Sequence, residues 1–133
     1  MKKITLIASL LLIAMPVLAS EPHTILTKTH AVPAPRLMSP FAGEVVLTGK
    51  SSLTFEWSTE GDPTRRQYYD FRIYKGRDML ASTLIYKEKI TAYKTDVKAD
   101  LFQNGGVYTW AVRQVYGGGD KSRRNFSSFK ITK

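Results

Sequence analysis

Hydrophobic and polar residues alternate along several short stretches of the chain, most clearly between residues 107 and 116. There Tyr108, Trp110 and Val112 share one face, while smaller or polar residues occupy the other. Alternation with a period of two, between glycine-rich turns, is typical of a β-strand with one face in a core. Aromatic side chains of this size need partners on a facing sheet, so the segment predicts a two-layered β structure.

Similar segments recur along the chain, and turn residues separate them. Glycine, proline or asparagine stands between most of them, and after residue 20 no segment has the periodicity of a helix. We expect strands over residues 37–47, 53–57, 69–74, 79–86, 93–101, 107–116 and 126–131. Seven short strands predict an all-β fold, a seven-stranded antiparallel sandwich of two sheets.

The inward positions of these strands carry large aromatic residues. We expect four of them to meet between the sheets: Trp57, Phe71, Tyr108 and Trp110. The chain has no cysteine and therefore no disulfide. The packing of this core must then supply most of the stability of the domain.

The first residues have the layout of a secretory signal peptide. Two lysines precede an apolar run over residues 4–15, Pro16 interrupts the run, and Val17-Leu18-Ala19 fits the positions before a cleavage site. This order predicts a signal peptide over residues 1–19 and export to the periplasm or the exterior. The proline-containing residues 20–35 predict a linker, and residues 36–133 predict one domain. No later stretch is apolar enough to span a membrane.

The order of inward residues between Pro35 and Thr132 resembles that of a fibronectin type III domain. The matching motifs are Leu53-x-Phe55-x-Trp57, Tyr69-x-Phe71-x-Ile73, Leu101 ahead of Tyr108-x-Trp110-x-Val112, and Ser127-x-Phe129-x-Ile131. The resemblance implies that Trp57 is the second-strand tryptophan of that family. It also implies that Leu101 and Tyr108 form a tyrosine corner, in which the phenol bonds to the backbone. An immunoglobulin-like domain without its disulfide is the alternative, and family membership implies a binding or spacing module.

The chain offers no arrangement of residues that is typical of a hydrolase. It has no cysteine, and its two histidines, His23 and His30, both lie in the expected linker. Nucleophilic catalysis needs a nucleophile beside a base, and the carboxylates are distributed over outward strand positions and loops. We therefore expect no enzyme activity, no metal site and no cofactor.

The chain is strongly basic, with 20 lysines and arginines against 11 aspartates and glutamates, a formal charge of +9. Loss of residues 1–19 would remove two lysines and leave +7. Such an excess favours an acidic partner: a protein, an anionic component of the cell envelope or a glycan. Export makes nucleic acid an improbable partner.

Three loops that are expected at one end of the sandwich carry much of this charge. They cover residues 58–67, 87–92 and 117–125, and they contain two Arg-Arg pairs. Guanidinium groups bind phosphate, sulfate and carboxylate bidentately. The candidate ligand-binding residues of these loops are Arg65, Arg66, Lys121, Arg123 and Arg124.

A second candidate surface is the outer face of the strands over residues 69–74 and 107–116. It would expose Tyr68, Arg72, Tyr74 and Arg113, residue types that anchor protein contacts. The leading hypothesis is a non-enzymatic exported binding or adhesion module that uses its loops. One alternative is a carbohydrate-binding module with Tyr68 and Tyr74 as its exposed aromatics. The other is a structural or chaperone-like subunit that pairs through an edge strand over residues 79–86.

Overall fold

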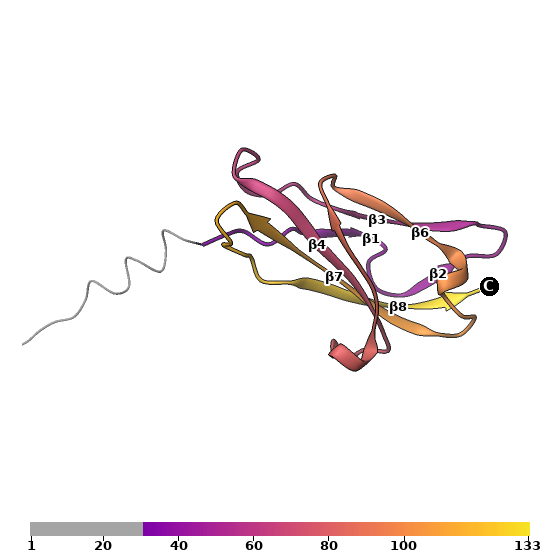
Figure 1. Cartoon of the computed structure of the whole chain (residues 1–133). Coiled ribbons are helices and arrows are strands. Elements are labelled where there is room, and N and C mark those ends of the chain that lie inside the picture. The colour runs from indigo at the N-terminus through magenta and orange to yellow at the C-terminus, as the bar shows by residue number, and fades with distance from the viewer. Residues whose placement is uncertain (1–30) are drawn as a thin grey trace, which may run out of the picture. The chain divides into compact units, whose positions relative to one another are not determined.

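The computed structural model describes residues 31–133, which form two β-sheets packed face to face (Figure 1). The predicted signal peptide and all but the end of the predicted linker lie outside the described residues. The strands are β1 (Leu37–Ser39), β2 (Glu44–Val46), β3 (Ser52–Trp57), β4 (Arg66–Lys75), β5 (Leu84–Ile90), β6 (Lys94–Lys98), β7 (Val107–Tyr116) and β8 (Asn125–Thr132). Two single-turn 3₁₀ helices, η1 (Ala81–Thr83) and η2 (Ala99–Leu101), precede β5 and follow β6.

One sheet has the strand order β1-β3-β6, and the other has the order β2-β8-β7-β4-β5. All neighbouring strands are antiparallel except β2 and β8, which pair in parallel. The predicted all-β, two-sheet sandwich is therefore confirmed. The two longest strands, β4 and β7, lie side by side within the larger sheet, so their outer faces form one continuous surface.

The described residues contain eight strands, not the expected seven. The segment 37–47 was expected to form one edge strand, but β1 joins the smaller sheet and β2 joins the larger one. Between them Ala42 and Gly43 adopt φ angles of 61° and 75°, a left-handed conformation that turns the chain out of the strand direction. Alternation of side chains cannot show this change of sheet, because both halves of the segment remain extended.

The boundaries of β5 also differ from those expected. The segment 79–86 was expected to be a strand and 87–92 a loop, but η1 occupies Ala81–Thr83 and the strand continues to Ile90. β5 pairs with β4 over its length, up to Tyr69 opposite Ile90. The partner strand decides where β5 ends, and two lysines that were placed in a loop thereby become part of the sheet.

Aromatic side chains fill the space between the sheets. Trp57 and Phe55 of β3 and Phe71 and Trp110 of the larger sheet are all 0% exposed. The rings of Trp57 and Phe71 are stacked with centroids 5.7 Å apart, and Phe55 meets the edge of Trp110 at 5.1 Å. Such contacts stabilise a core beyond the burial of apolar area. The indole Nε1 of Trp110 donates to the carbonyl of Pro40 at 2.9 Å, so the ring buries no unpaired donor.

Tyr108 lies at the other end of the core, where it packs against Phe102 and Phe129 with centroids 5.0 and 6.1 Å away. Its hydroxyl accepts a hydrogen bond from the backbone N–H of Gln103 at 2.8 Å. This is the bond to the backbone that a tyrosine corner requires. A Cβ at Gly106 would lie 2.8 Å from Cε2 of Tyr108, so glycine is needed where the tyrosine ring packs against the backbone.

Candidate functional site

Basic side chains gather on the outer face of the five-stranded sheet. Side chains alternate along a strand, so the outward positions of β4, β5 and β7 are free to carry charge while the inward ones fill the core. We call this surface the basic face; its residues are Tyr68, Asp70, Arg72, Lys87, Lys89, Arg113, Lys121 and Arg124. It carries six cations and one carboxylate. Residues 31–133 contain 17 basic and 10 acidic residues, a net +7, and +5 of this charge lies on the basic face.

The register of the strands brings these charges together. Asp70 on β4 lies opposite Lys89 on β5 and opposite Arg113 on β7. Two residues further along β4, Arg72 lies opposite Lys87. Directly opposed side chains on one face of a sheet are close enough to interact. Segments far apart in the sequence therefore form adjoining rows of charge across three strands.

Asp70 is the centre of an ion cluster, and its side chain is only 9% exposed. Arg72 donates from Nε to Oδ1 at 3.0 Å and from Nη2 to Oδ2 at 3.2 Å. Arg124, which directly precedes β8, donates from Nη2 to Oδ2 at 3.1 Å. The Nε of Arg113 forms a third ion pair with Oδ2 at 3.4 Å. Because one carboxylate faces three guanidinium groups, the cluster keeps a local excess of positive charge.

These contacts hold the pKa of Asp70 below its ordinary value. Burial acts to raise the pKa of this carboxyl, but the hydrogen bonds from Arg72 and Arg124 and their charges outweigh burial. For Arg72 the signs are reversed: burial acts to lower its pKa, and the bond to Asp70 brings the pKa above its ordinary value. Asp70 is therefore ionised at neutral pH.

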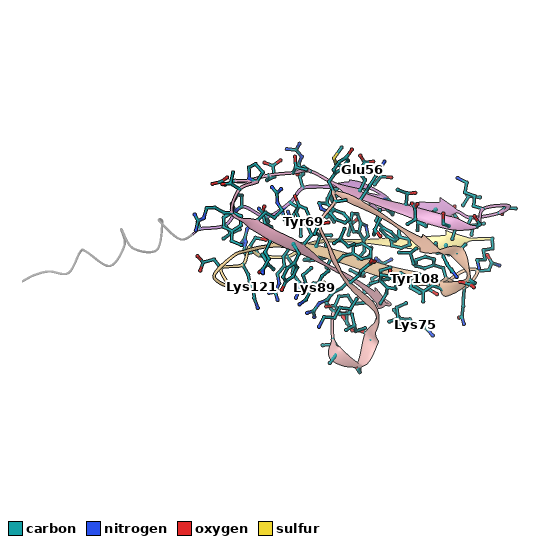
Figure 2. The ribbon with its side chains drawn as sticks, turned by 45° about the horizontal axis from the view of Figure 1, so that its top comes forward. Glu56, Tyr69, Lys75, Lys89, Tyr108 and Lys121 are labelled. Atoms are coloured by element: carbon teal, nitrogen blue, oxygen red, sulfur yellow. The ribbon has the colours of Figure 1, made fainter. Side chains whose placement is uncertain are left out.

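A cavity of about 250 Å³ opens on the basic face. It is lined by Tyr68, Asp70, Arg72, Lys87, Lys89, Arg113 and Lys121. The Nζ of Lys89 lies 4.8 Å from the ring centroid of Tyr68, a cation–π contact. Figure 2 shows Lys89 and Lys121 on the same side of the molecule, with Glu56 on the opposite side. A concave surface lined by one sign of charge focuses its field on an approaching anion.

The outer face of the smaller sheet has no such excess. Its outward charges on β3 and β6 are two acids and two bases, because Glu56 lies opposite Lys94 while Asp96 and Lys98 follow on β6. Thr54 donates a hydrogen bond to Asp96. The contrast shows that the positive charge of the sandwich is concentrated on one sheet.

Arg66, expected among the loop arginines, begins β4 and caps the end of the core. Its Nε donates to Oε1 of the buried Gln114 at 2.6 Å, and its Nη2 donates to the carbonyl of Glu60 at 2.9 Å. Its guanidinium carbon lies 5.0 Å from the ring centroid of Tyr69. These contacts occupy Arg66 on the core side of the sheet.

The remaining loop candidates lie in different surroundings. Arg65 covers the ring of Tyr116 at 4.9 Å and lies 4.0 Å from Asp120, while Arg123 is exposed. Arg124 and Lys121 belong to the basic face. The structure thus separates Arg65 and Arg66 from Arg124, and of the expected loop cluster it brings only Lys121 and Arg124 to the basic face.

The expectation of an exposed Tyr74 is wrong, since this side chain is only 4% exposed. β4 is an interior strand, and Tyr74 lies between Leu84 of β5 and Thr109 of β7 at a point where the register of β4 and β5 shifts. Tyr68, the other expected tyrosine, is half-buried and lines the cavity.

Sequence reasoning missed the part that Asp70 plays and the position of Lys87 and Lys89 in the sheet. The signal was available, because Tyr86, Glu88 and Ile90 alternate with the two lysines. Continuing the period of two beyond residue 86 would have placed both lysines on the outer face. The convergence of three arginines on Asp70 was not available, because it depends on the register between β4, β7 and β8.

Within residues 31–133, no three His, Cys, Asp or Glu side chains come together in a way that could hold a metal ion. In the same part of the chain, no helix is long and apolar enough to cross a membrane.

Comparison with known proteins identifies the fold through solved structures. No protein-family model matches the sequence, and no curated protein is similar to it. The structure is similar to a protein called FN3tt, with a TM-score of 0.50, 18% identity and coverage of 76% of this chain and 98% of that one. For the fibronectin(III)-like modules of CbhA from Clostridium thermocellum the TM-score is 0.52, the identity 15% and the coverage 74% and 96%. It is also similar to part of a β-1,2-glucanase from Parabacteroides distasonis, with a TM-score of 0.50, 19% identity and coverage of 77% of this chain and 13% of the enzyme.

Proposed function

We propose that this chain, which has a fibronectin type III-like fold, is a non-enzymatic exported binding module that holds an acidic partner on its basic face. The partner is an acidic protein or an anionic component of the cell envelope. The observation that carries the proposal is the placement of +5 of the net charge on one face of the sandwich, around a cationic cavity. The fold itself dictates no function, so the function is inferred from the charge of this surface.

The basic face supports binding better than the loops do. Arg66 is already engaged by Gln114 and the carbonyl of Glu60, and Arg65 lies against Tyr116. On the basic face, by contrast, six cations share one carboxylate. Like charges held this close repel one another, and an acidic partner would relieve that repulsion.

The basic face is also rigid. β4 and β7 pair continuously from Tyr68 to Lys75, and Asp70 holds the arginines beside it. Side chains that are fixed before binding lose less conformational entropy when a ligand arrives. The exposed lysines at the rim of the cavity add long-range attraction.

The expected aromatic pair of a carbohydrate-binding surface is not formed. Tyr74 is buried, and Tyr68 contacts Lys89. Pairing through the edge of β5 remains geometrically open, but Lys87, Glu88 and Lys89 lie on this edge, and charged side chains discourage strand addition. The charge of the basic face is therefore the better guide to function.

The test compares two triple variants with equal net charge. Lys87, Lys89 and Lys121 are each replaced by serine in one variant, and Lys50, Lys94 and Lys98 in the other. Binding to fluorescent poly-L-glutamate, dextran sulfate and anionic vesicles is measured by anisotropy or co-sedimentation. Each exposed charge pair contributes about 0.2–1 kcal/mol, so we expect the first variant to bind about tenfold more weakly and the control to change much less.

Added salt should reduce binding of the wild-type protein, since the Debye length falls from about 10 Å at 0.1 M to about 3 Å at 1 M. The three probes stand for three kinds of acidic partner: an acidic protein segment, a sulfated polymer and a lipid surface. Their relative affinities show which kind the basic face prefers. Equal losses in the two variants would show that general attraction, and not the basic face, causes the binding.

A further inference from the structure

Arg113 differs from Arg72 and Arg124 of the basic face because its Nε makes no hydrogen bond to Asp70. It lies on β7 opposite Asp70 of β4, one residue beyond Val112, the last residue of β7 that pairs with β8. Its side chain is 23% exposed and lines the cavity. The guanidinium group therefore borders the cavity beside Asp70.

Within residues 31–133, no hydrogen bond uses the side-chain donors of Arg113. Asp70 already accepts two hydrogen bonds from Arg72 and one from Arg124. The Nε of Arg113 lies 3.4 Å from Asp70 without a hydrogen bond, and within residues 31–133 its terminal nitrogens donate none either. The ion pair with Asp70 holds Arg113 at its Nε. The terminal nitrogens can therefore still donate hydrogen bonds to a ligand.

Two lysines extend the charge around this group. Lys89 and Lys121 line the same cavity, and Lys89 is placed by its contact with the ring of Tyr68. Figure 2 shows both lysines on the same side of the molecule. An anion in front of Arg113 would therefore also meet two exposed ammonium groups.

We propose that Arg113 is the anchor of a discrete oxyanion subsite, which binds one carboxylate, sulfate or phosphate group of the acidic partner. The terminal nitrogens of the guanidinium donate two parallel hydrogen bonds to two oxygens of that group, and Lys89 and Lys121 complete the charge balance. Planar forks of this kind match such oxyanions, whereas a lysine acts as a point charge. Asp70 is a positioning residue that orients Arg113. This subsite rests on the proposed function, because it specifies which chemical group the basic face holds.

The test keeps the positive charge at position 113 and removes the planar guanidinium group that can donate two parallel hydrogen bonds. Arg113→Lys is compared with Arg77→Lys, the same substitution at an exposed turn, and with the wild-type full chain. Sodium sulfate, phosphate and acetate are titrated against sodium chloride at matched ionic strength, and the arginine Nε–H resonances are followed by NMR. We expect the Arg113 signal of the wild type to shift and saturate in the millimolar range with at least one oxyanion. In Arg113→Lys, the affinity for the polyanion probes should fall about tenfold, while Arg77→Lys should bind normally.

The three anions identify the preferred group by their relative affinities. A small, non-saturating shift that is equal at all arginines would overturn the subsite, and so would unchanged polyanion binding by Arg113→Lys. If Arg113→Lys does not fold, the wild-type titration alone decides between these outcomes. The proposed function fails separately, by equal losses in the two lysine variants described above. The two failures are thus distinguishable.

Discussion

At the scale of single residues, Trp110 joins the two sheets most directly. It lies on β7, packs against Phe55 and Trp57 of the opposite sheet, and bonds through its indole to the carbonyl of Pro40. Pro40 lies where the chain leaves β1 on its way to β2. One side chain thus fixes the distance between the sheets and also the path of the chain that crosses from one to the other.

Trp110→Ala should lower the free energy of unfolding by about 3–5 kcal/mol, because it leaves a cavity and an unpaired carbonyl. This is a large share of the roughly 5–15 kcal/mol that stabilises a small domain. Urea unfolding followed by circular dichroism measures the loss. Lys98→Ala, at an exposed position of β6, is the control and should change little. Equal midpoints for the two variants would contradict the inward placement of Trp110.

Asp70 should make the free energy of unfolding depend on pH in the acidic range. Its pKa is lower in the folded state than in the unfolded chain, so its contribution is present above the unfolded pKa of about 3.9 and is lost as the pH falls through the folded value. We expect Asp70→Asn to be less stable than the wild type at pH 6. The difference in unfolding free energy should shrink towards pH 2. A difference that stays constant over this range would contradict the ion cluster.

At the scale of elements, the period-two pattern was a reliable guide wherever a strand has a buried face. It placed Trp57, Phe71 and Trp110 inward, and all three are fully buried. It failed where a distant partner decides the structure. The pairing of β2 with β8 splits segment 37–47, and pairing with β4 extends β5 beyond the expected boundary. Tyr74, which was placed outward, is buried.

The alternation in β5 makes a prediction about the basic face. Lys87 and Glu88 are neighbours in sequence, but Glu88 shares the face of Tyr86, whose hydroxyl donates to it at 2.6 Å. Lys87→Glu combined with Glu88→Lys exchanges the two charges and leaves composition and net charge unchanged. Because the exchange places an acid on the basic face, binding to the polyanion probes should weaken severalfold.

Anisotropy titration measures this effect, and the melting temperature shows whether the strand remains intact. The double variant with Lys94→Glu and Glu56→Lys, which exchanges an opposed pair on the smaller sheet, is the matched control. If both exchanges weaken binding alike, the face on which a charge lies has no influence on binding.

At the scale of the whole molecule, the charge is distributed unevenly between two sheets that share one core. The larger sheet carries the basic face, and the outward charges of β3 and β6 on the smaller sheet balance. An uneven field orients a protein as it approaches an acidic surface. We therefore expect the outer face of the larger sheet, together with Lys121 and Arg124 of the adjoining loop, to face the partner.

The proposed export makes a prediction about the N-terminus, which lies outside the described residues. The two lysines, the apolar run and Val17-Leu18-Ala19 predict cleavage before Ser20 or within a residue or two of it. Mass spectrometry of the protein from a periplasmic or culture fraction should find a chain that begins there. An intact Met1 in that fraction would contradict the prediction.

The parallel pairing of β2 with β8 has a mechanical consequence. Three residues of β2 lie beside Lys130, Ile131 and Thr132, and further backbone bonds join Leu47 to Thr132 and Lys130 to Gly43. When a domain is stretched from its two ends, parallel strands of this kind slide past each other, so all their bonds resist at once instead of opening one by one. A module that tethers an acidic partner under tension would therefore stay folded until the hydrogen bonds between β2 and β8 break together.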